Sequence, residues 1–215
     1  NLSIALLHPF TPGAAGLKEK SIPEYHSQPH ALALNKLVIE KKYDCYIDYF
    51  TSRKFSYTKK HKSLKYRFFP VNFSVRGDHK KWKKQISRSC SLAYTKSMPD
   101  VTIINMSGHS SDYSFELSKS ILSKGKRYIP MLGGQHYSDN DRNRLYYKNA
   151  DHILVHTNNQ KEEMLRMDMF KNLDIRVFPL GVDTKLFRPL ADSANLNHKR
   201  YPELLYVGRI VEWKR

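Results

Sequence analysis

Glycine and histidine residues gather where the apolar runs of this chain end. The residues that follow those runs are His8, Gly13, Gly16, Gly108, His109, Gly133, Gly134, Gln135, His136, His156 and Thr157. Glycine lets a backbone approach a ligand closely, and amide groups at the start of a following helix attract anions. Imidazole hydrogen-bonds sugar and phosphate groups. The pattern therefore predicts a site for a sugar or phosphate group.

The loop Pro12–Gly16 is the first candidate for such a site, with an ordinary turn as its alternative. It lacks the GxGxxG spacing of dinucleotide-binding proteins, and the chain contains no GxxxxGK[ST] sequence. The usual dinucleotide-binding and P-loop classes are therefore excluded.

Three histidines at strand ends, His8, His109 and His136, also raise the alternative of a zinc site. No carboxylate ligand stands near them in the sequence, so we expect no metal. We expect His109 to hydrogen-bond a sugar or phosphate group; a turn histidine satisfied by the backbone is its alternative. No pair of carboxylates of the glycoside hydrolase type is evident, and we nominate no general base.

The elements that would position these residues alternate between strands and helices. Apolar patterning predicts strands at 2–7, 44–50, 66–73, 101–106, 127–132, 151–155 and 175–178, and helices at 24–42, 79–97, 112–124, 140–148 and 159–170. Strands separated by helices predict an α/β fold with a doubly wound, mainly parallel sheet, whose ligands bind beyond the carboxyl ends of the strands.

The alternation of predicted strands and helices ends after Pro179, and glycine, proline and polar residues follow. We predict one domain over residues 1–179, an interdomain linker over 180–202, and the start of a second domain over 203–215.

Composition restricts the class of protein further. Hydrophobic residues make up 40% of the chain and charged residues 27%, as in a folded globular protein. The two cysteines, Cys45 and Cys90, have no metal-binding spacing and indicate a reducing, cytoplasmic setting. The net charge of +17 predicts an anionic partner: nucleic acid, an anionic lipid surface or a phosphorylated substrate.

Four stretches carry a resemblance to a known family. They are Asp151-His-Ile-Leu-Val-His-Thr-Asn-Asn-Gln-Lys-Glu, then Val177-Phe-Pro-Leu-Gly-Val-Asp with Phe187 and Pro189, then Leu204-Leu-Tyr-Val-Gly-Arg, and finally Lys214. In order and spacing the chain resembles the retaining glycosyltransferases of family 4. The resemblance implies the Rossmann-like N-terminal, acceptor-binding domain of a GT-B fold, with the donor-binding domain only begun.

The resemblance also implies roles for individual residues. Gly13 and Gly16 correspond to the glycine-rich loop near the donor phosphate and the acceptor. His136 is a further candidate for contact with the acceptor or a phosphate, because it follows a predicted strand. His109 corresponds to the histidine near the transferred sugar, and we take it as the catalytic residue. Arg209 and Lys214 correspond to the pair that grips the donor diphosphate, where two cations would neutralise the leaving group.

The activity implied is transfer of a sugar from a nucleotide-sugar donor to a glycan or lipid-linked acceptor, with retention and without metal or other cofactor. We expect this chain by itself to be inactive. The alternative is a non-catalytic module that binds an acceptor or acts in assembly.

The positive charge gathers in two regions, 53–67 and 80–88. In a helix over 79–97, Trp82, Ile86, Cys90 and Ala93 would share one face and lysines the others. Such a helix suits peripheral contact with an anionic membrane, although the apolar stripe could equally be core. Nucleic acid is the contrasting partner, with Tyr57, Tyr66 and Phe68 among the lysines, but without a recognised binding motif we do not expect it.

Overall fold

The structure is a computed structural model, and it describes residues 1–24, 29–106, 111–134 and 137–181. Residues Asn1–Val182 form one compact unit. The linker predicted over 180–202 and the segment 203–215 fall almost entirely outside the described residues, so this division into domains stays a prediction.

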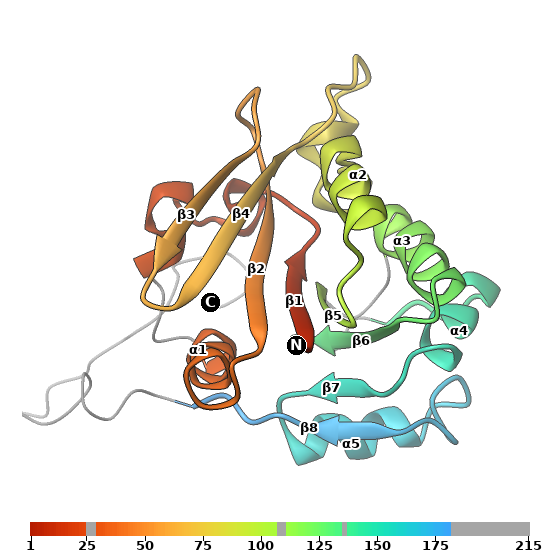
Figure 1. The fold of residues 1–215 in the computed structure, drawn as a ribbon. Helices are drawn as coiled ribbons and strands as arrows, with labels where there is room; N and C mark the ends of the chain where they lie inside the picture. Colours follow the sequence, from red (N-terminus) through yellow and green to blue (C-terminus); the bar gives the residue numbers. More distant parts are fainter. Residues whose placement is uncertain (25–28, 107–110, 135–136, 182–215) are drawn as a thin grey trace, which may run out of the picture. The chain divides into compact units, whose positions relative to one another are not determined.

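One sheet of eight strands forms the centre of the unit (Figure 1). The strands are β1 (Ser3–His8), β2 (Asp44–Thr51), β3 (Tyr57–His61), β4 (Leu64–Pro70), β5 (Val101–Met106), β6 (Arg127–Leu132), β7 (Ile153–Val155) and β8 (Ile175–Val177). Their order across the sheet is β3-β4-β2-β1-β5-β6-β7-β8. Every neighbouring pair is parallel except β3 and β4.

The order of the parallel strands reverses beside β1. From β1 the chain adds β2 and then β4 on one side, and it returns to the other side of β1 to add β5, β6, β7 and β8. This α/β architecture with a mostly parallel sheet confirms the predicted class and is compatible with a Rossmann-like fold.

Helices cover both faces of the sheet. The α-helices are α1 (Pro29–Lys41), α2 (Arg88–Lys96), α3 (Asp112–Ser123), α4 (Asp141–Lys148) and α5 (Asn158–Leu165). Alternate residues of β1 serve two separate cores: Ile4 and Leu6 pack in the core that includes α1, whereas Ala5 and Leu7 pack in the core that includes α2 to α5. A strand buried on both faces explains the continuous apolar run Ile4–Leu7.

The helix predicted over 79–97 is wrong in its first half. Two short 3-10 helices, Asp78–Lys80 and Trp82–Lys84, precede α2, and the backbone at Lys81 and Gln85 is extended. Ser87 then caps α2, because its hydroxyl accepts a hydrogen bond from the amide of Cys90. Trp82 and Ile86 therefore do not share a helical face with Cys90, and the predicted basic amphipathic helix does not exist.

The basic region 53–67 contains a strand that the sequence pattern did not predict. Strand β3 pairs with β4 as an antiparallel hairpin, closed by Lys62 in a left-handed conformation (φ 52°) and Ser63. The amide of Ser63 donates to the side chain of Asn35 on α1, which fastens the turn. Lysine has a low strand propensity, so β3 owes its place to pairing with β4. The other boundary changes are smaller: the helix expected at 24–42 starts at Pro29, after a 3-10 helix at Glu19–Glu24.

A buried ion pair fixes β2 against β4. Both guanidinium contacts from Arg67 to the carboxylate of Asp48 are 2.7 Å, and the hydroxyl of Tyr94 donates to the same carboxylate at 2.8 Å. The Arg67 guanidinium also lies 3.7 Å from the centre of the Tyr46 ring. Burial raises the pKa of Asp48 above its ordinary value, although the hydrogen bonds from Arg67 and Tyr94 favour the carboxylate.

Removing one partner of this pair should destabilise the fold strongly. We expect Arg67→Met to lower the free energy of unfolding by about 3 kcal/mol, since it leaves the fully buried carboxyl of Asp48 without its cation. Urea denaturation measures the difference. The control is Arg127→Met, which removes the exposed partner of Asp151 and should cost less than about 1 kcal/mol. Losses of equal size in the two variants would contradict the importance given to the Arg67–Asp48 pair.

Candidate functional site

The reversal of strand order places the candidate site at the carboxyl ends of β1 and its neighbours. In open parallel sheets the loops on either side of such a reversal diverge and leave a crevice. His8 ends β1, and its Nδ1 lies 2.8 Å from the side-chain amide of Asn105 on β5. This hydrogen bond joins the two strands directly at the reversal.

A cavity of about 770 Å³ opens on the same edge, beside β1, β2 and β4. Its lining comes from the loops that follow these three strands and from the segment before α2: Thr11, Gly13, Ala14, Ser52, Arg53, Lys54, Pro70, Val71, Phe73, His79, Lys80 and Gln85. The volume is within the range of ligand pockets. The lining includes three cations, of which Arg53 is paired with Glu19 at 3.2 Å. The charges of Lys54 and Lys80 favour a ligand with a negatively charged or electron-rich group.

The loop after β1 is held in place by Gln85. The side chain of Gln85, which is buried, accepts a hydrogen bond from the amide of Thr11 at 2.7 Å and donates to the Thr11 hydroxyl at 3.2 Å. This pair explains why the backbone is extended at Gln85 instead of continuing a helix. Gln85, which is 74 positions from Thr11 in the sequence, thus fixes the position of the loop after β1 at the wall of the cavity.

The two glycines of this loop have different positions. Residues Pro12–Ala15 form a 3-10 helix, and Gly16 ends it in a left-handed conformation (φ 72°) that favours glycine. Gly13 lines the cavity, and a Cβ added there would meet nothing within 4 Å. The backbone at Gly13 is therefore open toward a ligand, whereas Gly16 shapes the turn and is not part of the cavity lining.

Three histidines interact electrostatically beside the reversal. The ring of His8 stacks on Tyr49 with centroids 4.0 Å apart, and the ring of His30 on α1 lies 5.8 Å from it. Burial lowers the pKa of His8 well below its ordinary value, with a smaller contribution from His30. Burial also lowers the pKa of His30 to about 4, and the charge of His156 contributes. At neutral pH, His8 and His30 are therefore uncharged.

His8 offers a donor to a ligand. With the side-chain amide of Asn105 donating to Nδ1, the ring proton is on Nε2. That nitrogen is buried and has no hydrogen-bond partner among the residues that the structure describes. An oxygen atom placed at the crevice would satisfy it.

His156 is held by contacts at the ends of β7 and β8. Its Nδ1 donates to the carbonyl of Phe178 at 3.0 Å, which leaves Nε2 as an acceptor. Gln160 accepts from the amide of His156 and donates to the carbonyls of Leu132 and Gly134. The ends of β6 and β7 are therefore fixed to α5 by one side chain.

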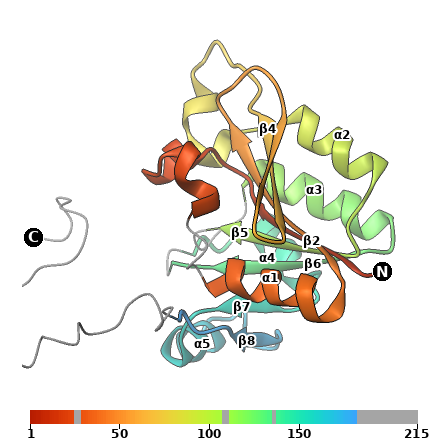
Figure 2. The same ribbon diagram turned by 60° about the vertical axis from the view of Figure 1, so that its left-hand side comes forward.

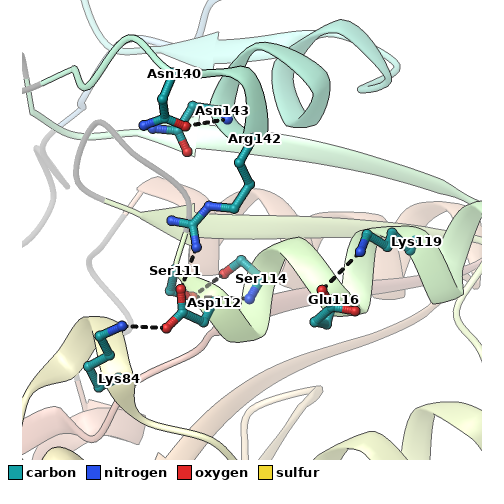
Figure 3. Close-up of polar contacts among 9 residues, drawn as sticks. All are labelled: Lys84, Ser111, Asp112, Ser114, Glu116, Lys119, Asn140, Arg142 and Asn143. Carbon is teal, nitrogen blue, oxygen red and sulfur yellow. Dashed lines mark hydrogen bonds and ion pairs between the residues drawn. The ribbon is translucent and has the colours of Figure 1, made fainter.

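Asp112 connects the elements on the other side of the reversal (Figure 3). Its carboxylate accepts hydrogen bonds from Lys84, at 2.7 Å, and from Arg142 on α4. The hydrogen bonds from Lys84 and Arg142 lower the pKa of Asp112 below its ordinary value. The N-caps Ser111 and Asn140, which begin α3 and α4, line the same small cavity of about 170 Å³ as Lys84, Asp112 and Arg142.

Four of the predicted site residues lie outside the described residues: His109, His136, Arg209 and Lys214. Their roles stay predictions. Of the strand-end residues that the structure describes, it brings His8 to the reversal and Gly13 to the cavity. In the described ranges, no group of three or more His, Cys, Asp or Glu residues could hold a metal ion. No helix among the described residues is long and apolar enough to cross a membrane.

Comparison of the chain with models of known protein families and with curated proteins gives no match. The case for a function therefore rests on the residues and geometry of the chain itself.

Several residues of the site were not predicted from the sequence. Gln85 and His30 stand within segments predicted as helix, and their roles depend on contacts with Thr11 and His8, which are far away in the sequence. Lys54 and Lys80 were recognised only as part of the basic regions. The rule that ligands bind beyond strand ends could have selected Lys54, because this residue closely follows the end of β2 at Thr51.

The histidines should make the fold sensitive to acid. The pKa of His30 is about 4 in the folded chain and about 6.5 when unfolded, so between these values the unfolded chain binds more protons. We expect the free energy of unfolding to fall as the pH drops from about 6.5 toward 4, by at most about 3 kcal/mol from His30. Urea denaturation of His30→Gln at pH 7 and pH 4.5 should show a smaller fall than the parent chain.

His152→Gln is the matched control for this prediction. The ring nitrogen Nδ1 of His152 lies 2.8 Å from the carboxylate of Asp151, so its electrostatic partner is a carboxylate and not a histidine pair of the kind formed by His8 and His30. An equal pH dependence in the parent chain and in His30→Gln would contradict the contribution assigned to His30.

Proposed function

We propose that this chain is the acceptor-binding domain of a retaining glycosyltransferase with a GT-B fold, similar to family 4. The observation that carries the proposal is the 770 Å³ cavity beside the reversal of strand order, bordered by the glycine-containing loop after β1. A Rossmann-like sheet with a polar cavity at that edge is suited to hold a substrate whose reacting group faces a second domain.

The cavity lining is suited to a sugar-like acceptor. Arg53, Lys54 and Lys80 donate hydrogen bonds to hydroxyl or phosphate oxygens, and Ser52 both donates and accepts. Val71 and Phe73 offer apolar surface to the carbon face of a ring. The absence of a carboxylate from this lining favours an acceptor with an anionic group.

In the proposed reaction, the bond between the anomeric carbon of the donor and its diphosphate oxygen breaks on one face. A hydroxyl oxygen of the acceptor bonds to the same carbon on that face, and its proton passes to the departing diphosphate. Arg209 and Lys214 neutralise the charge that develops on the diphosphate, and His109 binds the transferred sugar. The buried Nε2 of His8, at the carboxyl end of β1, is a further donor that this chain offers to a substrate oxygen.

The first test uses a protein in which this chain is joined to a donor-binding half. We expect it to consume at least one nucleotide sugar in a donor screen, and we expect His109→Ala to lower kcat by about a hundredfold or more because a contact made in the transition state is lost. Product formation is followed by chromatography. His152→Ala is the control. Equal turnover in His109→Ala and the control would remove His109 from the site.

The second test concerns the acceptor cavity. We expect Lys54→Ala and Lys80→Ala each to raise the KM for an anionic acceptor about tenfold with little change in kcat, as for contacts present before and during the reaction. Lys41→Ala, on the exposed last turn of α1, is the control. A fall in kcat without a change in KM would place these lysines at the donor and not at the acceptor.

A non-catalytic binding module is the second candidate function. It is favoured by the fact that the cavity is lined wholly by residues of the unit Asn1–Val182. Retention of acceptor binding without turnover of any donor in the joined protein would support this candidate over the transferase.

A further inference from the structure

Two loops carry the most exposed large apolar side chains among the described residues. Phe55 lies between β2 and β3 and is 81% exposed, and Phe73 and Val75, between β4 and the 3-10 helix at Asp78–Lys80, are 80% and 94% exposed. The next in rank, Leu180 and Leu92, reach only 65% and 61%. Exposure of this degree at three positions on two loops is unfavourable in water unless another surface covers them.

The two loops project from the same end of the unit. Figures 1 and 2 show both extending beyond the sheet on the side of the carboxyl ends of β2 and β4. They also line parts of the same cavity, through Ser52, Arg53 and Lys54 from one loop and Val71 and Phe73 from the other. Phe55 and Val75 are not part of this lining.

Positive charge surrounds these apolar side chains. Residues 52–56 include two cations, of which Arg53 is paired with Glu19 at 3.2 Å and Lys54 is exposed. Residues 72–83 include four cations and a single carboxylate, Asp78, which lies 3.8 Å from Lys81. Apolar side chains on loops with cations around them match the two layers of an anionic bilayer, whose acyl region is apolar and whose headgroups are negative.

We propose that these two loops insert into the surface of an anionic membrane, with Phe55 and Val75 in the acyl boundary and the surrounding cations against lipid phosphates, while Phe73 stays at the cavity that it lines. A single-stranded nucleic acid would use the rings for base stacking, but Val75, the most exposed of the three, has no ring to stack. A flat protein partner is also less suited, because the side chains stand on separate loops.

This surface replaces the helix over 79–97 as the membrane contact. Lys80, Lys81 and Lys83 retain a place in it, but they lie in the 3-10 helices and the turn between them and not on an amphipathic α-helix. The inference does not depend on the transfer reaction, since a binding module with the same loops would dock in the same way. If both proposals hold, the acceptor cavity opens beside the lipid surface.

Vesicle co-sedimentation tests the proposal on the intact chain. We expect the chain to bind vesicles of phosphatidylserine and phosphatidylcholine, to bind pure phosphatidylcholine much more weakly, and to be released by high salt. Phe55→Ser/Val75→Ser should weaken binding at least about tenfold. These two residues do not line the acceptor cavity, so acceptor binding should be unchanged.

Matched variants separate this surface from general effects. Ile39→Ser/Leu92→Ser removes exposed apolar side chains from α1 and α2 and should leave vesicle binding unchanged. Arg76→Ser/Lys81→Ser should weaken binding to anionic vesicles at least about fivefold, and Lys41→Ser/Lys148→Ser much less. Circular dichroism confirms that each variant is folded.

Three results would overturn the proposal. The first is failure of the parent chain to bind anionic vesicles. The second is equal binding by Phe55→Ser/Val75→Ser and by Ile39→Ser/Leu92→Ser. The third is a loss of binding to a homopolymeric RNA in Phe55→Ser/Val75→Ser while vesicle binding persists, which would assign the loops to nucleic acid.

Discussion

The reversal of strand order beside β1 is the constraint on which the rest of the site depends. Because β2 and β4 are added on one side of β1 and β5 on the other, the carboxyl end of β1 lies where the strand order reverses, and α1 and α3 pack in different cores. His8 and Asn105 are hydrogen-bonded at this point, and the loop Thr11–Gly16 contributes residues to the adjacent cavity. The buried Arg67–Asp48 pair keeps β4 in register with β2, so the outer wall of the cavity is as well fixed as the central strands.

Much of this framework is a consequence of local sequence. A strand buried on both faces needs a largely apolar run, and Ile4–Leu7 and Tyr128–Leu132 are such runs, so the existence of β1 and β6 could be predicted. Strand β3 could not, because its two lysines have low strand propensity and the strand depends on pairing with β4. The segment 79–87 has helical periodicity, but Gln85 gains more from its buried hydrogen bonds with Thr11 than a continued helix would give it.

The residues of the candidate site also divide into those that local sequence predicts and those that depend on contacts far away in the sequence. A rule about strand ends was sufficient to select His8 and Gly13, because the position of a residue after a strand is a local property. His30 and Gln85 belong to the site through contacts with residues far away in the sequence, His8 and Thr11, and one sequence carries no local sign of such contacts. The family resemblance names His109, Arg209 and Lys214, which are predictions of a different kind. They rest on motif spacing alone, whereas the cavity and the histidine group rest on contacts in the fold.

The structure also changes what the net charge of +17 means. Part of the positive charge is neutralised within the fold, by Asp48 against Arg67 and by Asp112 against Lys84 and Arg142. Around the cavity, Arg53 is paired with Glu19 and Lys81 with Asp78, whereas Lys54 and Lys80 lie exposed in the same region as Phe55, Phe73 and Val75. A high net charge alone explains attraction to any polyanion, and it cannot distinguish lipid from nucleic acid. The proposed membrane surface rests on charge combined with exposed apolar side chains, since an acyl layer would cover those side chains while the lipid phosphates above it face the cations.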